Sequence, residues 1–572
     1  MIVERDHELD ALRGWFADAD ACRGRVVVVS GEAGIGKTAL LTELREACGQ
    51  ADWLECQCDS QFTPRPFGPL FDVADRLGDD LERSLRRGDD RQQVFASLLD
   101  RLGNRRSTTV FVVEDIQWAD EATLDLVRYA GRRITDERVL IVLTCRDDAS
   151  ADDTIRLVIG DLARLDATRR IELGPLTLDG VAAMCATTSV DAREIHELSG
   201  GNPFFAGELI GAAGRATPTI VDAVRSRLIG LDADTLAALE LAAVAGMRVS
   251  PSALRDTDRM STATERLLVD RGILAIDEYG SSFRHDITRR TVLDRVPPRQ
   301  RRELHQRLLD GLVATGSDDD ALLAHHAERA GDRDATLRYA TRAASVARRV
   351  GSARDAVIQL ERALSASDRD DLATTARLHD ELADAFGLLH DLERSLDARA
   401  VAVETWTRLD DPARRADSLA RGAWVACALG RVDVAFDDAR SALDLLEPLG
   451  PSRELAAAHA TLARLFGLVN RADAALAEVD TGRALADELG LDDLRAEFGN
   501  IGACCRALRG EPWVDEMRRT VDIARSIPTS RWSAVPSTTG TACWSTTANS
   551  TPPTRSTPWR STTRHCTIST PM

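Results

Sequence analysis

The stretch Val26-Val27-Val28-Val29-Ser30-Gly31-Glu32-Ala33-Gly34-Ile35-Gly36-Lys37-Thr38 decides the fold of this 572-residue chain. Four consecutive valines indicate a buried strand, and the glycine-rich segment after them leads into a helix predicted over residues 38–47. The glycines let the backbone bend and direct its N–H groups toward phosphate oxygens. The helix start adds favourable dipole charge. The spacing therefore predicts a phosphate-binding loop, with a purely structural glycine turn as the alternative.

The basic residue of this loop is the only lysine in the chain, and all other basic residues are arginine. A compact ammonium suits this position better than a planar guanidinium. We expect Lys37 to reach the β- and γ-phosphates of ATP or ADP and Thr38 to offer its hydroxyl to Mg²⁺. The predicted nucleotide-binding residues of the loop are Gly31, Glu32, Ala33, Gly34, Ile35, Gly36, Lys37 and Thr38.

Two further apolar runs, at residues 109–113 and 139–144, are predicted strands. Apolar strands alternating with helices indicate an α/β fold with a parallel sheet covered on both faces, whose ligands bind at the carboxyl ends of the strands. Glu114 and Asp115 follow the second strand, and Arg146 ends the third. We expect Glu114 and Asp115 to serve the Mg²⁺ site, Asp115 to polarise the attacking water, and Arg146 to sense the γ-phosphate. Solvated acids and a surface arginine are the alternatives.

Three nearby residues have structural explanations to set against functional ones. Asp120 is predicted to cap a helix over residues 121–130 rather than to catalyse. Trp118 is expected to pack rather than to stack on adenine. Pro203, in Gly201-Asn202-Pro203, is either a simple turn or a hinge that contacts nucleotide.

The remainder of the chain is predicted to be mostly helical. Residues 1–165 form the expected P-loop core, 166–215 a helical lid, and 216–300 a winged-helix-like unit with a hairpin between residues 273–276 and 282–284. Residues 301–527 indicate an α-solenoid of tetratricopeptide (TPR)-like repeats, because small residues recur about every 40 positions. These are Ala356, Ser395, Ala435 and Ala475.

The last segment, residues 528–572, has a different composition. Of residues 529–572, 21 of 44 are Ser or Thr, and no acidic residue follows Asp522. We expect this tail to be disordered. A shifted reading frame is our hypothesis for its origin, and it leaves open whether a DNA-binding module was lost.

Composition restricts the classes of partner. The net charge of −19 argues against general affinity for nucleic acid or anionic membranes. Residues 216–300 carry 12 Arg and 12 acidic residues, so the winged unit has no basic surplus for phosphate contacts. No apolar run approaches the roughly 18 residues that span a bilayer. The 11 Cys are scattered, and we expect reduced thiols in a cytoplasmic protein.

The motifs together resemble those of the signal-transduction ATPases with numerous domains, and most closely the large ATP-binding regulators of the LuxR type. The matching segments are Arg5-Asp6-His7-Glu8-Leu9, residues 31–38, Val113-Glu114-Asp115-Ile116-Gln117-Trp118-Ala119-Asp120, Thr144-Cys145-Arg146-Asp147, Gly201-Asn202-Pro203-Phe204-Phe205 and Phe283-Arg284-His285-Asp286. The resemblance implies that Arg5 lies near adenine, although Glu4 stands where the family has glycine. Many relatives end in a DNA-binding helix-turn-helix, which this sequence does not show.

The resemblance implies a nucleotide switch, closed with ADP and opened by ATP, that responds to a protein or small molecule on the helical repeats and self-associates. Our leading hypothesis is a regulatory switch and slow ATPase. A non-catalytic scaffold that nucleotide stabilises is the second. A DNA-binding transcription regulator, truncated before its helix-turn-helix, is the third, and we do not expect this chain to bind DNA directly. The sequence leaves the effector, output pathway, oligomeric state and hydrolysis rate open.

Overall fold

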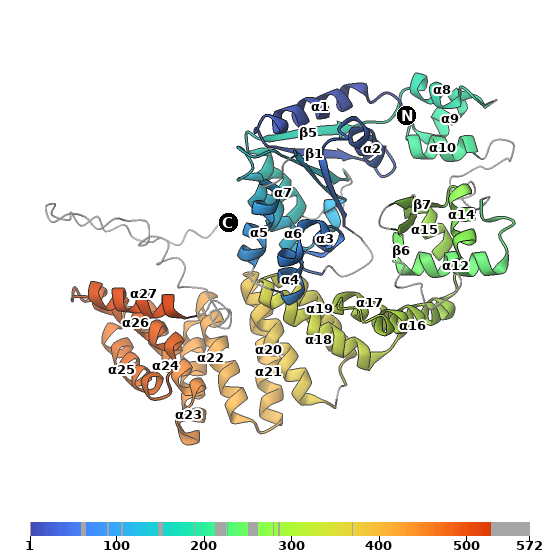
Figure 1. Cartoon of the computed structure of the whole chain (residues 1–572). Helices are drawn as coiled ribbons and strands as arrows, with labels where there is room; N and C mark the ends of the chain where they lie inside the picture. Colours follow the sequence, from blue (N-terminus) through green and yellow to red (C-terminus); the bar gives the residue numbers. More distant parts are fainter. Residues whose placement is uncertain are drawn as a thin grey trace.

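A five-stranded parallel sheet lies at the centre of the N-terminal part of the chain (Figure 1). The computed structural model describes residues 2–58, 65–88, 91–103, 107–146, 153–188, 190–211, 225, 227–249, 261–277, 280–283, 286–368 and 370–527. The strand order is β2-β3-β4-β1-β5. The strands are β1 (Arg25–Gly31), β2 (Asp52–Gln57), β3 (Thr109–Glu114), β4 (Val139–Cys145) and β5 (Thr168–Leu173).

Both faces of the sheet are covered by helices, which is why its central strands are apolar throughout. Val27 and Val29 of β1 pack in one core with α1 (Asp6–Asp20) and α2 (Lys37–Ala47). Val26 and Val28 belong to the core on the other face. That face is covered by α3 (Ala74–Leu77), α4 (Asp79–Arg87), α5 (Arg91–Gly103), α6 (Glu121–Gly131) and α7 (Asp153–Ala163), with the 3₁₀ turns η1 (Gly68–Asp72) and η2 (Ile116–Trp118).

The three predicted strands are confirmed as β1, β3 and β4, and the predicted parallel sheet is confirmed. The sequence did not indicate β2 and β5, which lie at the two edges of the sheet. The last strand, β5, pairs along its length with β1. The sheet therefore extends to Leu173, beyond the expected domain boundary at residue 165.

Two small units follow the sheet. The first contains α8 (Leu178–Cys185), α9 (Ala192–Ser199) and α10 (Pro203–Gly211), which share their own apolar core. The second contains α12 (Ala233–Ala245), α14 (Thr262–Asp270) and α15 (Asp286–Leu293) with a three-stranded antiparallel sheet of β6 (Arg248–Val249), β7 (Leu274–Asp277) and β8 (Gly280–Phe283). The predicted hairpin is confirmed as β7 and β8; its turn at residues 278–279 and Arg284 lie outside the described residues.

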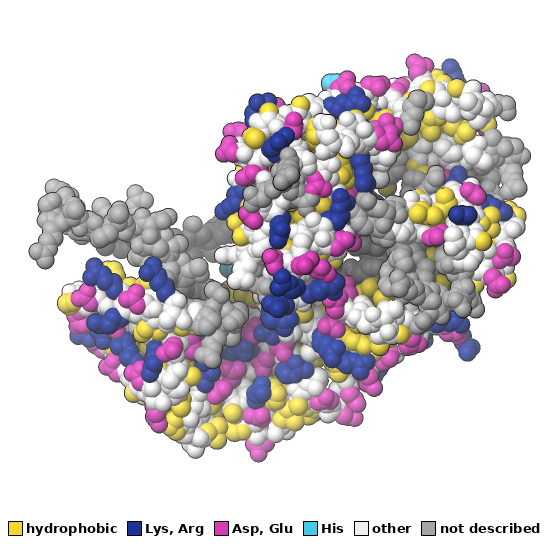
Figure 2. All heavy atoms as spheres, in the orientation of Figure 1, with side chains coloured by type: hydrophobic (Ala, Val, Ile, Leu, Met, Phe, Trp, Pro, Cys, Tyr) yellow, Lys and Arg dark blue, Asp and Glu magenta, His cyan; other side chains and the backbone are white. Residues whose placement is uncertain are grey.

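Antiparallel helices then stack into an arc, coloured yellow-green to red in Figure 1. They are α16 (Pro298–Ala314), α17 (Asp320–Ala330), α18 (Arg333–Val350), α19 (Ala353–Ala366), α20 (Leu372–Leu388), α21 (Leu392–Arg408), α22 (Pro412–Ala428), α23 (Val432–Leu446), α24 (Arg453–Leu468), α25 (Ala472–Glu488), α26 (Asp492–Leu508) and α27 (Val514–Ser526), with the 3₁₀ turn η4 (Glu447–Leu449). The space-filling view shows basic and acidic side chains interspersed over these repeats (Figure 2). The tail, residues 528–572, lies outside the described residues.

The predicted small-residue repeat is confirmed. Ala356, Ser395, Ala435 and Ala475 each stand at the fourth position of α19, α21, α23 or α25, and all four are buried. Within the described part of the chain, every helix is too short or too polar to cross a bilayer.

The first repeats contact the sheet domain directly. Val350 of α18 is part of the apolar core that covers β3 and β4. The Glu121 carboxylate at the start of α6 accepts a hydrogen bond of 3.1 Å from the backbone N–H of Arg354. Asp318, between α16 and α17, forms ion pairs with Arg65 at 3.3 Å and Arg86 at 2.6 Å. The repeats are thereby anchored beside the carboxyl-terminal end of β3.

Candidate nucleotide-binding site

The glycine loop connects β1 to α2, as the sequence predicts. Gly34 and Gly36 have φ angles of 80° and 103°, which side-chain-bearing residues rarely adopt. A Cβ at Gly34 would also lie 2.8 Å from Cβ of Phe204. Gly36 is the N-cap of α2, and no side chain caps that helix. An uncapped helix start behind a glycine loop fits a phosphate group.

Lys37 lies at the first position of α2 and is buried. Its Nζ donates hydrogen bonds to the carbonyl oxygens of Gly31, at 2.7 Å, and Glu32, at 3.0 Å. These two bonds hold the ammonium against the loop itself. The position is one from which a flexible lysine side chain reaches an anion cradled by the loop.

Thr38 and Glu114 meet across the ends of α2 and β3. The Thr38 hydroxyl donates a hydrogen bond of 2.7 Å to Oε2 of Glu114. Burial raises the pKa of the Glu114 carboxyl to about 8, and this effect outweighs the Thr38 hydrogen bond, which lowers it. The neighbouring Glu55 adds to the increase. A hydroxyl beside a carboxylate is an oxygen donor set that suits Mg²⁺, and a dication there would favour the charged carboxylate.

Asp115 and Arg146 are brought together by a small polar network. Asp115 adopts a left-handed backbone with φ of 55°, and its N–H donates to the Thr144 hydroxyl at 2.8 Å. Gln117 donates from Nε2 to Oδ1 of Asp115 at 2.8 Å and accepts from the Arg146 N–H at 3.2 Å. Nε of Arg146 lies 3.9 Å from the same Asp115 oxygen. The network holds the Asp115 carboxylate and the Arg146 guanidinium side by side at the strand ends.

Thr144 and Gln117 lie within the matching segments, but neither was predicted to belong to the site. Thr144 is the one polar residue within the otherwise apolar strand run of β4, Val139-Leu140-Ile141-Val142-Leu143-Thr144-Cys145. It is almost completely buried. A buried hydroxyl in such a strand requires a partner, and that requirement was a usable signal.

The Gly-Asn-Pro turn packs directly on the glycine loop. Asn202 is buried, and its Nδ2 donates to the carbonyl oxygen of Ala33 at 3.0 Å. Its Oδ1 accepts from the N–H of Phe204 at 3.1 Å, and that N–H also lies 3.3 Å from the Gly34 carbonyl oxygen. Pro203, the predicted hinge residue, lies close to Gly36: its Cγ is 3.9 Å from where a Cβ on that glycine would stand. The sequence singled out the proline, but its two neighbours make the polar contacts.

The remaining predicted residues lie around this site. Arg5 is buried, and its guanidinium donates to the Gly174 carbonyl oxygen at 2.5 Å. Its proximity to adenine stays a prediction. Asp120 caps α6, as predicted, by accepting from the Thr123 N–H at 2.8 Å. Trp118 exposes 39% of its surface.

Comparison with known proteins agrees with this geometry. Residues 2–142 match the family model described as the AAA ATPase domain. The chain carries an AAA ATPase domain. The predicted resemblance to signal-transduction ATPases is confirmed in two features, an AAA ATPase domain and the helical repeats that follow it. The closer link to LuxR-type regulators stays a prediction.

Several known proteins are similar to parts of this chain. An uncharacterized protein of Rhizobium meliloti (strain 1021) is 26% identical over 414 residues, covering 58% of this chain and 39% of the relative. The chain thus spans about two fifths of the length of that curated relative. A signal-transduction ATPase with a tetratricopeptide repeat sensor from Pyrococcus horikoshii has a TM-score of 0.43 at 14% identity, with 91% of this chain and 95% of that chain covered. A structure described as nearly identical TPR-like repeats of a putative kinesin light chain from Podosopora anserina has a TM-score of 0.29 at 16% identity. It covers 33% of this chain and 93% of that chain. These structural likenesses are too distant to carry an argument about function.

Proposed function

We propose that this chain is an ATP-dependent regulatory switch, in which Mg·ATP binding and slow hydrolysis gate a helical-repeat sensor in signal transduction or transcription regulation. The AAA ATPase domain supports nucleotide binding. The observation that carries the switch is the contact of Asn202 and Phe204 with the glycine loop. A phosphate in the loop would act on these bonds, and they belong to the unit that follows β5.

Each site residue has a role in this proposal. The glycine loop and Lys37 would bind the phosphates, and Thr38 with Glu114 would hold Mg²⁺, which supplies charge neutralisation when bound. Asp115 would orient and polarise water, and Arg146 would respond to the terminal phosphate. The fixed Asp115 backbone and the Gln117 bridge keep these two side chains in place.

The test compares the ATP affinity of the Lys37→Ala variant with that of the wild-type chain. Loss of a charge-assisted phosphate contact costs about 1.5–3 kcal/mol, which is about a 10- to 150-fold loss of ATP affinity in titration calorimetry. Arg13→Ala is the matched control, because it removes one positive charge from an exposed site on α1. Equal affinity of the wild-type chain and Lys37→Ala would refute the proposal.

A second readout uses the uniqueness of this lysine. An acylating ATP analogue has Lys37 as its only lysine target. We expect labelling at Lys37 that excess ATP prevents, located by peptide mass spectrometry. Labelling that ATP does not block would contradict nucleotide occupancy of the loop.

A non-catalytic scaffold is the second candidate, and Glu114 favours it. The usual order of this motif places aspartate first, whereas here a buried glutamate already accepts the Thr38 hydroxyl. Nucleotide binding without turnover, and equal hydrogen exchange of the repeats in ADP and ATP, would select the scaffold. Sequence-specific DNA binding that resists salt would instead revive the transcription-factor hypothesis. The effector, as a protein or small molecule on the repeats, and nucleotide-dependent self-association belong to the switch proposal.

A further inference from the structure

Three histidines meet between α16 and α17, away from the nucleotide site. His305 lies on α16, and His325 and His326 lie on α17. The ring centroids are 5.2–5.7 Å apart in all three pairs. One nitrogen from each ring lies within 4.8 Å of the others. In the described part of the chain, this is the one group of three or more metal-ligating side chains at such distances.

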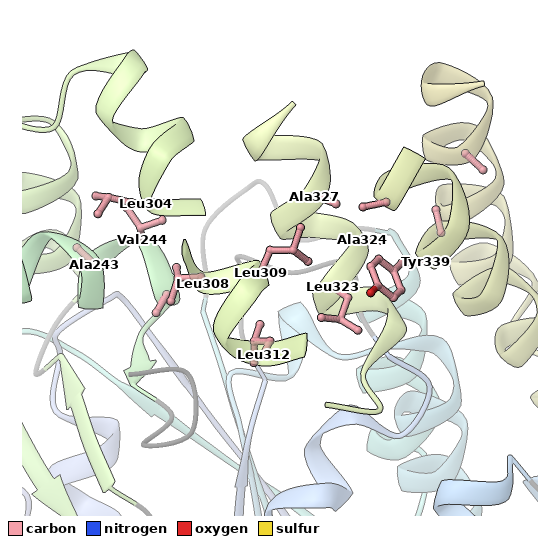
Figure 3. Close-up of a cluster of buried hydrophobic side chains, with 14 of the residues drawn as sticks. Ala243, Val244, Leu304, Leu308, Leu309, Leu312, Leu323, Ala324, Ala327 and Tyr339 are labelled. Carbon is pink, nitrogen blue, oxygen red and sulfur yellow. The ribbon is translucent and has the colours of Figure 1, made fainter. Parts of the chain in front are cut away.

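The cluster is set in an apolar environment. Leu304, Leu308 and Leu309 of α16 and Leu323, Ala324 and Ala327 of α17 are buried around the same helix pair. Figure 3 shows Leu309 directed toward α17 and Leu304 directed toward Val244 of α12. His325 and His326 are themselves buried.

The spacing of the nitrogens is close to that of a zinc site. Nδ1 of His305 and Nδ1 of His326 are 2.9 Å apart. Two imidazole nitrogens on tetrahedral Zn²⁺ are about 3.3 Å apart, because each Zn–N bond is about 2.0–2.1 Å. Zinc binding would therefore separate Nδ1 of His305 from Nδ1 of His326 by about 0.4 Å more. The nitrogen of His325 would move closer to them by about 1.5 Å at most.

We propose that His305, His325 and His326 form a binding site for Zn²⁺ that joins α16 to α17. Three nitrogen ligands without thiolate or carboxylate suit a borderline cation such as Zn²⁺ rather than Mg²⁺. A fourth position remains for water. Arg301, Arg329 and Arg362 oppose a dication, and the Arg362–Glu328 ion pair of 3.0 Å offsets part of that charge. The metal would hold together the helix pair that connects the winged unit to the repeats.

The test measures zinc directly in a full-length chain without a polyhistidine tag. After desalting, we expect one Zn²⁺ per chain by elemental mass spectrometry. His305→Gln and His326→Gln should each weaken zinc affinity at least about 100-fold in chelator competition, because loss of a ligand costs more than loss of its supporting hydrogen bond. His379→Gln is the matched control, since this partly buried histidine lies on α20, outside the cluster.

Spectroscopy on the unchanged chain keeps the test independent of how the variants fold. X-ray absorption at the zinc edge should show three imidazole nitrogens at about 2.0–2.1 Å. Titration with Co²⁺ should give the intense visible absorption of a tetrahedral site, abolished by stoichiometric Zn²⁺. Absence of bound zinc, or zinc held by sulfur or carboxylate ligands, would overturn the proposal and leave a packed cluster joined by an N–H···N bond. ATP binding is unaffected by either outcome, so this test is separate from the switch proposal.

Discussion

Replacing Asn202 by aspartate separates the two hydrogen-bonding roles of this side chain. Oδ1 of Asn202 accepts from the Phe204 N–H at 3.1 Å at the start of α10, and an aspartate oxygen accepts equally well. Nδ2 donates to the Ala33 carbonyl at 3.0 Å, and Asn202→Asp places an oxygen there instead. The variant therefore keeps the helix start and loses the bond to the glycine loop.

The size of the effect follows from the Ala33 carbonyl oxygen, which stays in place without its hydrogen-bond donor. Losing one partly buried hydrogen bond and leaving its acceptor facing an oxygen costs about 1–3 kcal/mol. If the loop binds phosphate in the arrangement that Asn202 supports, ATP affinity falls by about 5- to 150-fold. The new negative charge beside the loop acts in the same direction. Titration calorimetry with Mg·ATP and Mg·ADP measures the effect.

The control and the refuting result are well defined. Asn470→Asp makes the same charge change at an exposed turn with φ of 63°, a conformation that aspartate tolerates. We expect its nucleotide affinity to equal that of the wild-type chain. If Asn202→Asp folds normally and binds ATP and ADP within twofold of the wild type, the Gly-Asn-Pro turn is not coupled to the nucleotide site.

The remaining predictions concern the helical repeats. Gly482→Ala should lower the free energy of unfolding by about 1–3 kcal/mol, because its Cβ would lie 2.1 Å from the Phe498 ring. Urea denaturation measures this change. Gly467→Ala is the control and should not destabilise the chain, because the nearest atom to its Cβ would be 3.5 Å away. Arg399→Ala should cost up to about 3–5 kcal/mol, because it removes a buried guanidinium that pairs with both Asp380 and Asp384 at 2.6 Å, while Arg421 still pairs with Asp384. Burial acts to raise the pKa of Asp384, but Arg399, Arg421 and Arg348 together outweigh it and hold that pKa below its usual value. The stabilisation is thus present above about pH 4 and lost as pH falls through the lowered pKa, so the defect of Arg399→Ala should shrink in acid. A defect that is constant with pH would contradict this account.

The parts of the sheet that the sequence predicted are those whose burial is complete. In β1, β3 and β4 both faces meet helices, so each strand is a continuous apolar run. The edge strand β5, Thr-Arg-Arg-Ile-Glu-Leu, has exposed positions that break that run, and β2 is interrupted in the same way. Propensity and periodicity do not distinguish such short mixed segments from loops.

The candidate site was predictable to the extent that its residues form local motifs. The loop residues and Glu114 follow from spacing and strand ends, and the structure brings Thr38 to Glu114 at 2.7 Å. Asn202 and Ala33 are 169 residues apart in sequence. Their contact depends on how the unit after β5 folds back, and no local pattern encodes that. Pro203 was predicted to be a turn or hinge residue, yet the amide beside it makes the bond.

Two of the contacts between the region of the candidate nucleotide site and the rest of the chain differ in kind. One runs through α6, where Glu121 accepts from the exposed N–H of Arg354, a bond that solvent weakens. The other runs through Asn202, which is buried and bonds to the glycine loop itself. A ligand shifts a conformational equilibrium only through interactions that differ between the two states. The Asn202 contact involves backbone atoms of the loop that would bind phosphate, whereas the Glu121 contact involves only the outer end of a helix. In the switch proposal, the energy that gates the repeats would therefore come from the Gly-Asn-Pro turn, and the α6 contact would mainly position the repeats beside the sheet.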